Sequence, residues 1–211
     1  GAMQAKGVFG MVSRESALLM NNILLAVAAF VVFVGTIWPL VAELLLGRVL
    51  SVGAPFFNVA FTPFMVALAV IMPVGAILPW KRGSIAKALM PLRGALALSL
   101  AVGLLAWAMG TGRSAVGPVG LALGVWLVLG AVTDLLQRSG RGAIGQRVAR
   151  MFRLPRADWR RAIAHAGLGI TFIGVAGLTA WDVEDIRVVR IGESYEVAGH
   201  AITLDEVKRV Q

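Results

Sequence analysis

Residues Ala17–Leu46 read ALLMNNILLAVAAFVVFVGTIWPLVAELLL, and Glu43 is the only charged side chain among them. About 20 apolar residues in an α-helix are enough to cross the roughly 30 Å hydrocarbon core of a bilayer. No water reaches the backbone in that core, and a helix satisfies its own amide and carbonyl groups. The segment therefore predicts a transmembrane helix, and it is too long to be the hydrophobic core of a signal peptide.

Four more apolar stretches follow the first one. They are Phe57–Trp80, Gly94–Met109, Val119–Leu136 and Ala162–Trp181. The five stretches predict an all-α polytopic membrane protein with about five transmembrane helices, whose spans lie near 17–46, 57–80, 94–109, 119–136 and 162–181. Within them, a kink is expected at Pro73, because proline lacks the amide hydrogen of a helix bond. Gly120 and Gly124 form a small-xxx-small pair, which is typical of close helix packing.

The composition agrees with a membrane protein. Hydrophobic residues make up 58% of the chain and charged residues 15%, with a mean hydropathy of +0.82. Soluble domains usually carry about 25% charged residues, and a soluble chain of 211 residues could not bury so much apolar surface. The chain has no cysteine, so it holds neither a disulfide nor a dithiol, and any thiol chemistry belongs to a partner.

Lysine and arginine are concentrated in alternate connections between the apolar stretches. The basic connections carry Lys6 and Arg14, then Lys81, Arg82, Lys87 and Arg93, then the arginines of a basic loop at 137–161. The two other connections carry only Arg48 and Arg113. Because positively charged loops stay in the cytoplasm, we expect a multi-pass protein of the bacterial inner (plasma) membrane. Its N-terminus and the basic loop are expected to be cytoplasmic and its C-terminal tail periplasmic.

The basic loop is also amphipathic. Ile144, Val148, Met151 and Phe152 fall on one helical face, while Arg147, Arg150 and Arg153 fall on the other. Such a segment is expected to lie in the headgroup region of the membrane, with its arginines near anionic lipid. The net charge of +9 could also suggest nucleic acid, but no nucleic-acid-binding module accompanies it. The expected partner is the lipid bilayer, with no nucleic acid.

The tail after Trp181 changes to a strand-like pattern. Strands are predicted at 186–191, 195–197 and 200–207, with turns at glycines between them. Two or three strands alone are marginal in water, so residues 182–211 are expected to be the beginning of a periplasmic β domain. The transmembrane helical region is then 1–181, and the chain is expected to be a fragment or one piece of a complex.

His165 is the one residue of the spans that is suited to a cofactor. It lies about one turn inside the fifth stretch, and a neutral imidazole there can ligate heme iron. Gly169, one turn further along the same face, would leave room for a porphyrin edge. Arg161, one turn earlier, is placed to meet a heme propionate. The alternative is that His165 bonds a carbonyl at the interface and that Arg161 reaches lipid phosphate.

A second heme ligand would have to come from outside this chain. The other histidine, His200, belongs to the tail, where we expect a solvated surface residue. Among the spans, no charge lies at a midpoint of the kind that transporters and proton pumps use.

The chain resembles the C-terminal part of CcmF, the heme-lyase family of bacterial cytochrome c maturation. The resemblance rests on Ser13-Arg14-Glu15 followed by Asn21-Asn22, on Ala164-His165-Ala166-Gly167, and on the tail beginning Val188-Val189-Arg190-Ile191-Gly192-Glu193. It implies an inner-membrane protein that takes heme from a heme chaperone and promotes its attachment to apocytochrome c. It further implies a transmembrane heme b, held by two histidines and thought to reduce the incoming heme, with His165 as one axial ligand. Partners would be the remaining N-terminal part of the same protein or subunit, the heme chaperone, and apocytochrome c with its thiol reductant.

The sequence departs from that family in its heme-handling residues. The tryptophan-rich loop with its Trp-Trp-Asp signature is absent, and Trp181-Asp182 is not that motif. The family's other heme-binding histidines have no counterpart here. The chain alone is therefore not expected to perform ligation. The alternatives are a permease or channel subunit, or a cofactor-free membrane assembly scaffold.

Overall fold

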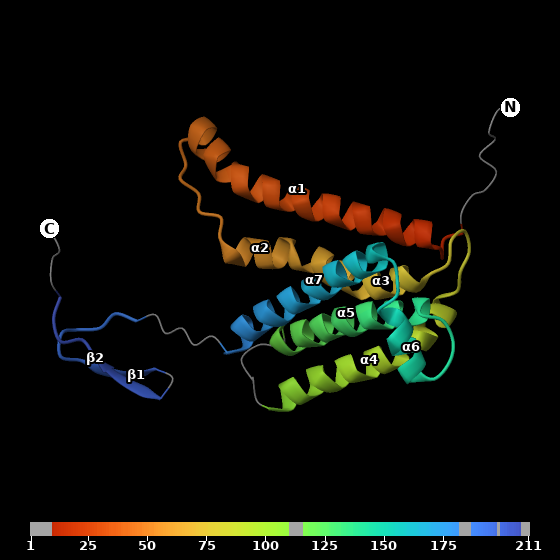
Figure 1. Cartoon of the computed structure of the whole chain (residues 1–211). Helices are drawn as coiled ribbons and strands as arrows, with labels where there is room; N and C mark the ends of the chain where they lie inside the picture. Colours follow the sequence, from red (N-terminus) through yellow and green to blue (C-terminus); the bar gives the residue numbers. More distant parts are fainter. Residues whose placement is uncertain (1–9, 110–115, 182–186, 198, 208–211) are drawn as a thin grey trace.

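The structure is a computed structural model that describes residues 10–109, 116–181, 187–197 and 199–207 (Figure 1). Its helices are α1 (Arg14–Leu46), α2 (Ala54–Ala60), α3 (Thr62–Ile77), α4 (Ile85–Ala108), α5 (Val116–Arg138), α6 (Ile144–Met151) and α7 (Arg156–Trp181). Four helices, α1, α4, α5 and α7, are long and apolar enough to cross a membrane, and the bent pair α2 and α3 makes a fifth candidate. The predicted fold class is confirmed. Lys6 and Arg113 lie outside the described residues.

The start of α1 is fixed by a cap and by the loop between α3 and α4. The Ser13 side chain accepts a hydrogen bond from the Ser16 amide at 3.1 Å, which satisfies one of the free amides of the first turn. The Arg14 amide donates to the Pro79 carbonyl at 3.0 Å. Both oxygens of Glu15 accept the Lys81 amide, at 3.1 and 2.9 Å. The short polar lead before the first span is therefore tied to a distant loop.

The second predicted span is two helices rather than one. α2 and α3 meet at Phe61 with a bend of 43°. Pro63 lies in the first turn of α3, where its missing amide hydrogen costs nothing, and α3 continues through Pro73. The break in this span is thus beside the proline that starts α3, and the kink expected at Pro73, inside the continuous α3, stays a prediction.

The third span is longer than its apolar stretch. α4 begins at Ile85, nine residues before the predicted start at Gly94, and runs through Pro91. The added turns contain Lys87 and Arg93, which interrupt the apolar pattern but are good helix formers. Their long side chains can carry the charge toward the interface while the helix continues. The prediction missed the first two turns of this helix because it relied on uninterrupted apolar residues.

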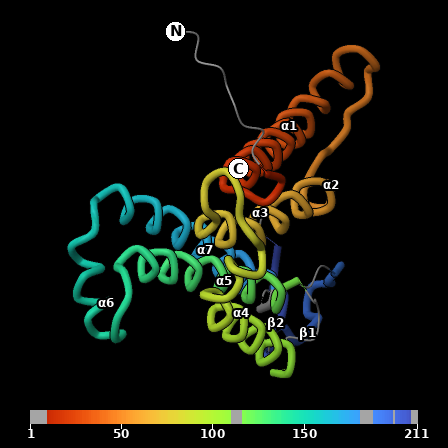
Figure 2. The backbone as a smooth tube through the Cα atoms, turned by 90° about the vertical axis from the view of Figure 1, so that its right-hand side faces the viewer, coloured from red at the N-terminus to blue at the C-terminus, as the bar shows by residue number. Residues whose placement is uncertain are grey.

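α5 is the centre of the helix packing. It packs against α7, α4 and α3, while α1 packs against α3 and α2, so α3 lies between α1 and α5 (Figure 2). The Trp126 indole of α5 donates to the Val70 carbonyl of α3 at 3.3 Å. Gly120 and Gly124 lie at the contact with α7: a Cβ on Gly120 would come within 2.7 Å of the Ala176 Cβ. The predicted close packing of this glycine pair is confirmed.

The basic connections lie together at one end of the bundle. The start of α1, the connection between α3 and α4, and α6 lie at that end, and the β-hairpin lies at the other (Figure 1). Backbone hydrogen bonds join the first two, from the Gly10 amide to the Lys81 carbonyl at 2.8 Å and from the Gly83 amide to the Val12 carbonyl at 2.7 Å. The alternation of basic and non-basic loops in the sequence thus corresponds to two ends of the structure.

The tail forms a single antiparallel hairpin of β1 (Ser194–Val197) and β2 (His200–Thr203), with Ser194 opposite Thr203. The strand predicted at 195–197 is confirmed with one more residue at its start, and the strand predicted at 200–207 is confirmed in shorter form. The first predicted strand is wrong over its described part, 187–191, which is not a strand. There the Arg190 amide donates to the Glu193 carboxylate at 2.9 Å, and the Glu193 amide donates to the Arg190 carbonyl at 3.0 Å. These bonds form a turn that leads into the hairpin.

Candidate functional site

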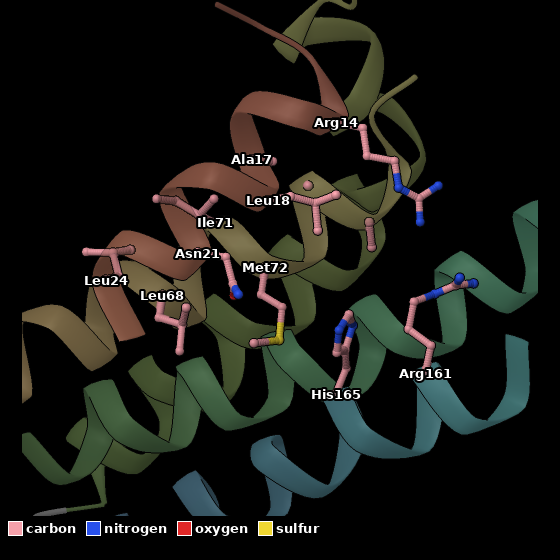
Figure 3. A pocket seen from close by; sticks show the side chains of 12 residues that line it. Arg14, Ala17, Leu18, Asn21, Leu24, Leu68, Ile71, Met72, Arg161 and His165 are labelled. Atoms are coloured by element: carbon pink, nitrogen blue, oxygen red, sulfur yellow. The ribbon is translucent and has the colours of Figure 1, made fainter. Parts of the chain in front are cut away.

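A cavity of about 130 Å³ lies between α1, α3 and α7 (Figure 3). It exists because α1 packs on α3 while α7 packs on α5, which leaves a gap between α1 and α7. The residues that line it are Arg14, Ala17, Leu18, Asn21, Leu24, Leu68, Ile71, Met72, Gly75, Ala76, Arg161 and His165. Its walls are thus mainly aliphatic, and two arginines and one imidazole supply its cationic and metal-binding chemistry.

His165 projects from α7 into this cavity, beside Met72 of α3 (Figure 3). The side chain is half-buried. In the part of the chain that the structure describes, its ring takes part in no hydrogen bond, so the interfacial carbonyl contact of the alternative interpretation does not form. An imidazole without a partner retains the nitrogen lone pair that metal ligation uses.

Arg161 also lines the cavity, but it is bound in a cluster of four charged groups. Its Nη2 lies 3.0 Å from Asp134 Oδ2 of α5 and 2.9 Å from Asp158 Oδ1 of α7. Arg138 contacts the same two carboxylates, at 3.0 and 3.4 Å. This ion-pair cluster (Asp134, Arg138, Asp158 and Arg161) joins the end of α5 to the beginning of α7. The sequence analysis missed it, because Asp134 and Arg161 are 27 residues apart.

Gly169 lies against α5, where the absence of a Cβ allows the two helices to approach closely. A Cβ on Gly169 would come within 2.7 Å of the Gly124 carbonyl oxygen and 2.8 Å of Val128 Cγ2. The residue does not line the cavity that contains His165 and Arg161. Its expected contact with a porphyrin edge stays a prediction, while its packing role is evident from the structure.

Arg14 is a cavity residue that the sequence shows as a basic loop charge and as part of Ser13-Arg14-Glu15, with no sign of a site. It is the first residue of α1, and its guanidinium carbon lies 5.1 Å from the centre of the Trp80 ring. Arg14 and Arg161 extend toward one another at the same end of the cavity (Figure 3). The tertiary arrangement of α1 and α7, which the sequence pattern does not contain, brings these two arginines together.

The cavity fits part of a heme site. Its imidazole, aliphatic walls and terminal arginines suit an apolar tetrapyrrole with carboxylate edges. Its volume is smaller than the roughly 300–1,000 Å³ of most ligand pockets, so a tetrapyrrole requires α1 and α7 to stand further apart. Among the described residues, no group of three or more histidine, cysteine, aspartate or glutamate side chains is arranged for a metal ion.

Comparison with known proteins places this chain in a family. The chain is 58% identical over 208 residues to the cytochrome c-type biogenesis protein Ccl1 of Rhodobacter capsulatus, covering 99% of this chain and 31% of that protein. The chain belongs to the CcmF/CycK family. It is 42% identical to CycK of Rhizobium meliloti, over 98% of this chain and 31% of CycK. It is 34% identical to CcmF of Escherichia coli, over 94% of this chain and 29% of CcmF.

The match covers a limited part of these relatives. The chain spans about a third of the length of the curated family members and corresponds to a C-terminal portion of them. No family model matches the chain, and no solved structure matches it. The resemblance to CcmF is therefore confirmed by sequence, and the relatives of this chain are cytochrome c-type biogenesis proteins.

Proposed function

We propose that this chain is the C-terminal membrane portion of a cytochrome c-type biogenesis heme lyase. In this proposal His165 is one axial ligand of a transmembrane heme b, and a helix from outside this chain supplies the other ligand. The observation that carries the proposal is the His165 imidazole: it has no hydrogen-bond partner among the described residues, and it faces an aliphatic cavity with arginines at one end.

The residues in and around the cavity have different roles in this proposal. His165 offers a neutral nitrogen to iron, and Leu18, Leu24 and Leu68 keep water from the tetrapyrrole faces. The contact expected between Arg161 and a propionate stays a prediction, and in the described structure its Nε and Nη2 donate to Asp134 and Asp158. Gly169 keeps α7 close to α5, so the face of α7 that carries His165 is directed to the gap beside α1.

A bound heme b would supply an iron that changes oxidation state inside the membrane, which suits reduction of heme delivered by a heme chaperone. This chain has no cysteine, so it would hold an electron-transferring group while the thiol chemistry on apocytochrome c belongs to its thiol reductant. Capture of the incoming heme would belong to the remaining part of the protein, because the tryptophan-rich loop is absent from this sequence.

The direct test is the heme content of the protein purified from membranes together with the region that precedes this segment in its relatives. We expect a low-spin b-type spectrum from the unmodified protein, because two nitrogen ligands give a six-coordinate iron. His165→Ala should lose most of the heme or convert it to a high-spin form. The measurement is the reduced-minus-oxidised absorbance spectrum, with heme quantified as its pyridine complex.

The matched control is His200→Ala, which changes the other histidine of the chain. His200 lies in β2 at the opposite end from the ion-pair cluster, so its removal should leave the spectrum unchanged (Figure 1). Full heme content with an unaltered spectrum in His165→Ala would reject His165 as the ligand. A colourless unmodified protein would instead favour a cofactor-free scaffold.

A further inference from the structure

The cavity has cationic groups at one end only. Arg14 from α1 and Arg161 from α7 lie there, and the remaining lining is aliphatic apart from Asn21, His165 and Met72 (Figure 3). A ligand that fills it must therefore be apolar along most of its length and anionic at that end. The two arginines differ in how much of their charge is available to such an anion.

The charge of Arg161 is already balanced. The ion-pair cluster contains two arginines and two aspartates, with N–O distances of 2.9–3.4 Å, so it is neutral as a whole. The Asp134 side chain is only 5% exposed, and it contacts both arginines. An anion that bound to Arg161 would come close to Asp134 and Asp158 as well, and their repulsion would cancel much of the attraction.

Arg14 has no such balance. In the described part of the chain no carboxylate forms an ion pair with Arg14, and its guanidinium lies over the face of Trp80 at 5.1 Å. Glu15, the next residue, is directed to the Lys81 amide instead. Stacking on an aromatic ring orients a guanidinium while leaving its edge N–H groups free to donate. The cap at Ser13 and the bond from the Arg14 amide to Pro79 fix the backbone below it.

We propose that Arg14 is the carboxylate-binding residue of the cavity and that it pairs with a propionate of the heme proposed above. This inference rests on the proposed function. The positive charge that neutralises the propionate would then come from Arg14 on α1, across the gap from His165. Arg161 would keep its ion pair with Asp134, which joins α7 to α5. His165 would then hold the iron and Arg14 a propionate of one ligand, from two helices that pack mainly on other helices.

The test is the heme midpoint potential in the protein purified with its preceding region, in Arg14→Gln and Arg14→Lys variants. An unpaired propionate stabilises the more positively charged ferric state, so Arg14→Gln should shift the midpoint potential to lower values. Arg14→Lys should keep the midpoint potential close to that of the unmodified protein, because a lysine keeps the charge. The control is Arg48→Gln, which removes an exposed arginine beyond the other end of the same helix and should leave the potential unchanged.

The outcomes separate this inference from the proposed function. A heme-loaded Arg14→Gln protein with an unchanged midpoint potential overturns the role of Arg14 and leaves His165 ligation untouched. An equal shift in Arg14→Gln and Arg14→Lys also overturns it, because only a charge-independent structural effect would treat both variants alike. Absence of heme from the unmodified protein overturns both proposals together. If Arg14→Gln does not fold, Arg14→Met takes its place, because it also removes the charge and the same fall in midpoint potential is expected.

Discussion

Arg161 is the residue at which the sequence and the structure differ most. One turn from His165, it was expected to be available for a propionate, and the helix spacing alone supports that interpretation. The structure adds two carboxylates, Asp134 from α5 and Asp158 from its own helix, at 3.0 and 2.9 Å. A one-dimensional pattern reports the neighbours on a helix face, but it does not report which side chain of another helix reaches that face.

The ion-pair cluster predicts a stability effect. Removing one partner of a buried ion pair costs roughly 3–5 kcal/mol because the other charge is left uncompensated. The Arg161 side chain is 27% exposed, so we expect Arg161→Met to lose an amount at or below the lower end of that range. Arg160→Met, an exposed neighbour on the same helix, should change stability by no more than about 0.5 kcal/mol. Thermal unfolding in detergent measures both, and equal melting temperatures for the two variants would contradict this account.

His165 could be singled out from the sequence because its argument needed only chemistry and no knowledge of helix packing. A histidine inside an apolar span is expensive to place, so its presence already indicates a partner or a ligand. The structure directs it into a cavity, while its ligation of iron stays a prediction. Arg14 could not be found in this way: nothing in the sequence relates the start of the first helix to the start of the last.

At the scale of elements, the α5–α7 contact depends on two facing glycines. A Cβ on Gly169 would lie 2.7 Å from the Gly124 carbonyl oxygen, a backbone atom that cannot rotate away. Gly169→Ala should therefore separate α7 from α5, lowering the melting temperature and the heme content together. The control is Gly167→Ala on the same helix, where a Cβ meets open space. Alanine favours a helix over glycine by about 1 kcal/mol, so that variant should be neutral or slightly more stable.

Loss of heme in Gly167→Ala with retention in Gly169→Ala would contradict this packing assignment. It would mean that the open side of α7, rather than its α5 side, positions His165.

The existence of the helices was predictable, and their ends were less so. Apolar runs near 20 residues leave few alternatives in a bilayer, and each predicted span has a helix over most of its length. The start of α4 was missed because Lys87 and Arg93 end the apolar run without ending the helix. The break at Phe61 was missed because either Pro63 or Pro73 could have bent the second span, and only tertiary packing distinguishes them.

At the scale of the whole molecule, the exterior is as apolar as a lipid-facing surface requires. Large side chains such as Phe30, Leu104 and Leu178 are 65–70% exposed, which would be costly in water. Of the buried polar residues in the described part, Ser13, Asp134 and Ser139 belong to the ends of α1 and α5 at the basic end, whereas Ser99 lies within α4 and donates to the Ala95 carbonyl. This distribution agrees with a multi-pass membrane protein and leaves its orientation to be measured.

The orientation can be tested because the chain has no cysteine of its own. Single cysteines can be introduced at two exposed positions, Arg141→Cys beside α6 and His200→Cys in β2. If the basic end is cytoplasmic, a membrane-impermeant maleimide added to intact spheroplasts should label His200→Cys and spare Arg141→Cys. Labelling of both after the membrane is permeabilised shows that each site is reactive. The reverse pattern in intact spheroplasts would contradict the proposed orientation.

The two ends of the molecule were predictable from charge alone, because alternate loops must alternate sides. The gap between α1 and α7 was not. The gap results because α1 packs against α3 while α7 packs against α5. The sequence pattern does not show which helices pack together.

The most direct measurement of iron ligation is chemical rescue of His165→Gly in the protein purified with its preceding region. Removing the imidazole leaves a space in which free imidazole can bind the iron. We expect a high-spin or heme-depleted spectrum without added imidazole, and recovery of the low-spin b-type spectrum when heme and imidazole are supplied. A His165→Gly protein that shows the full low-spin spectrum with no imidazole added would contradict the central claim.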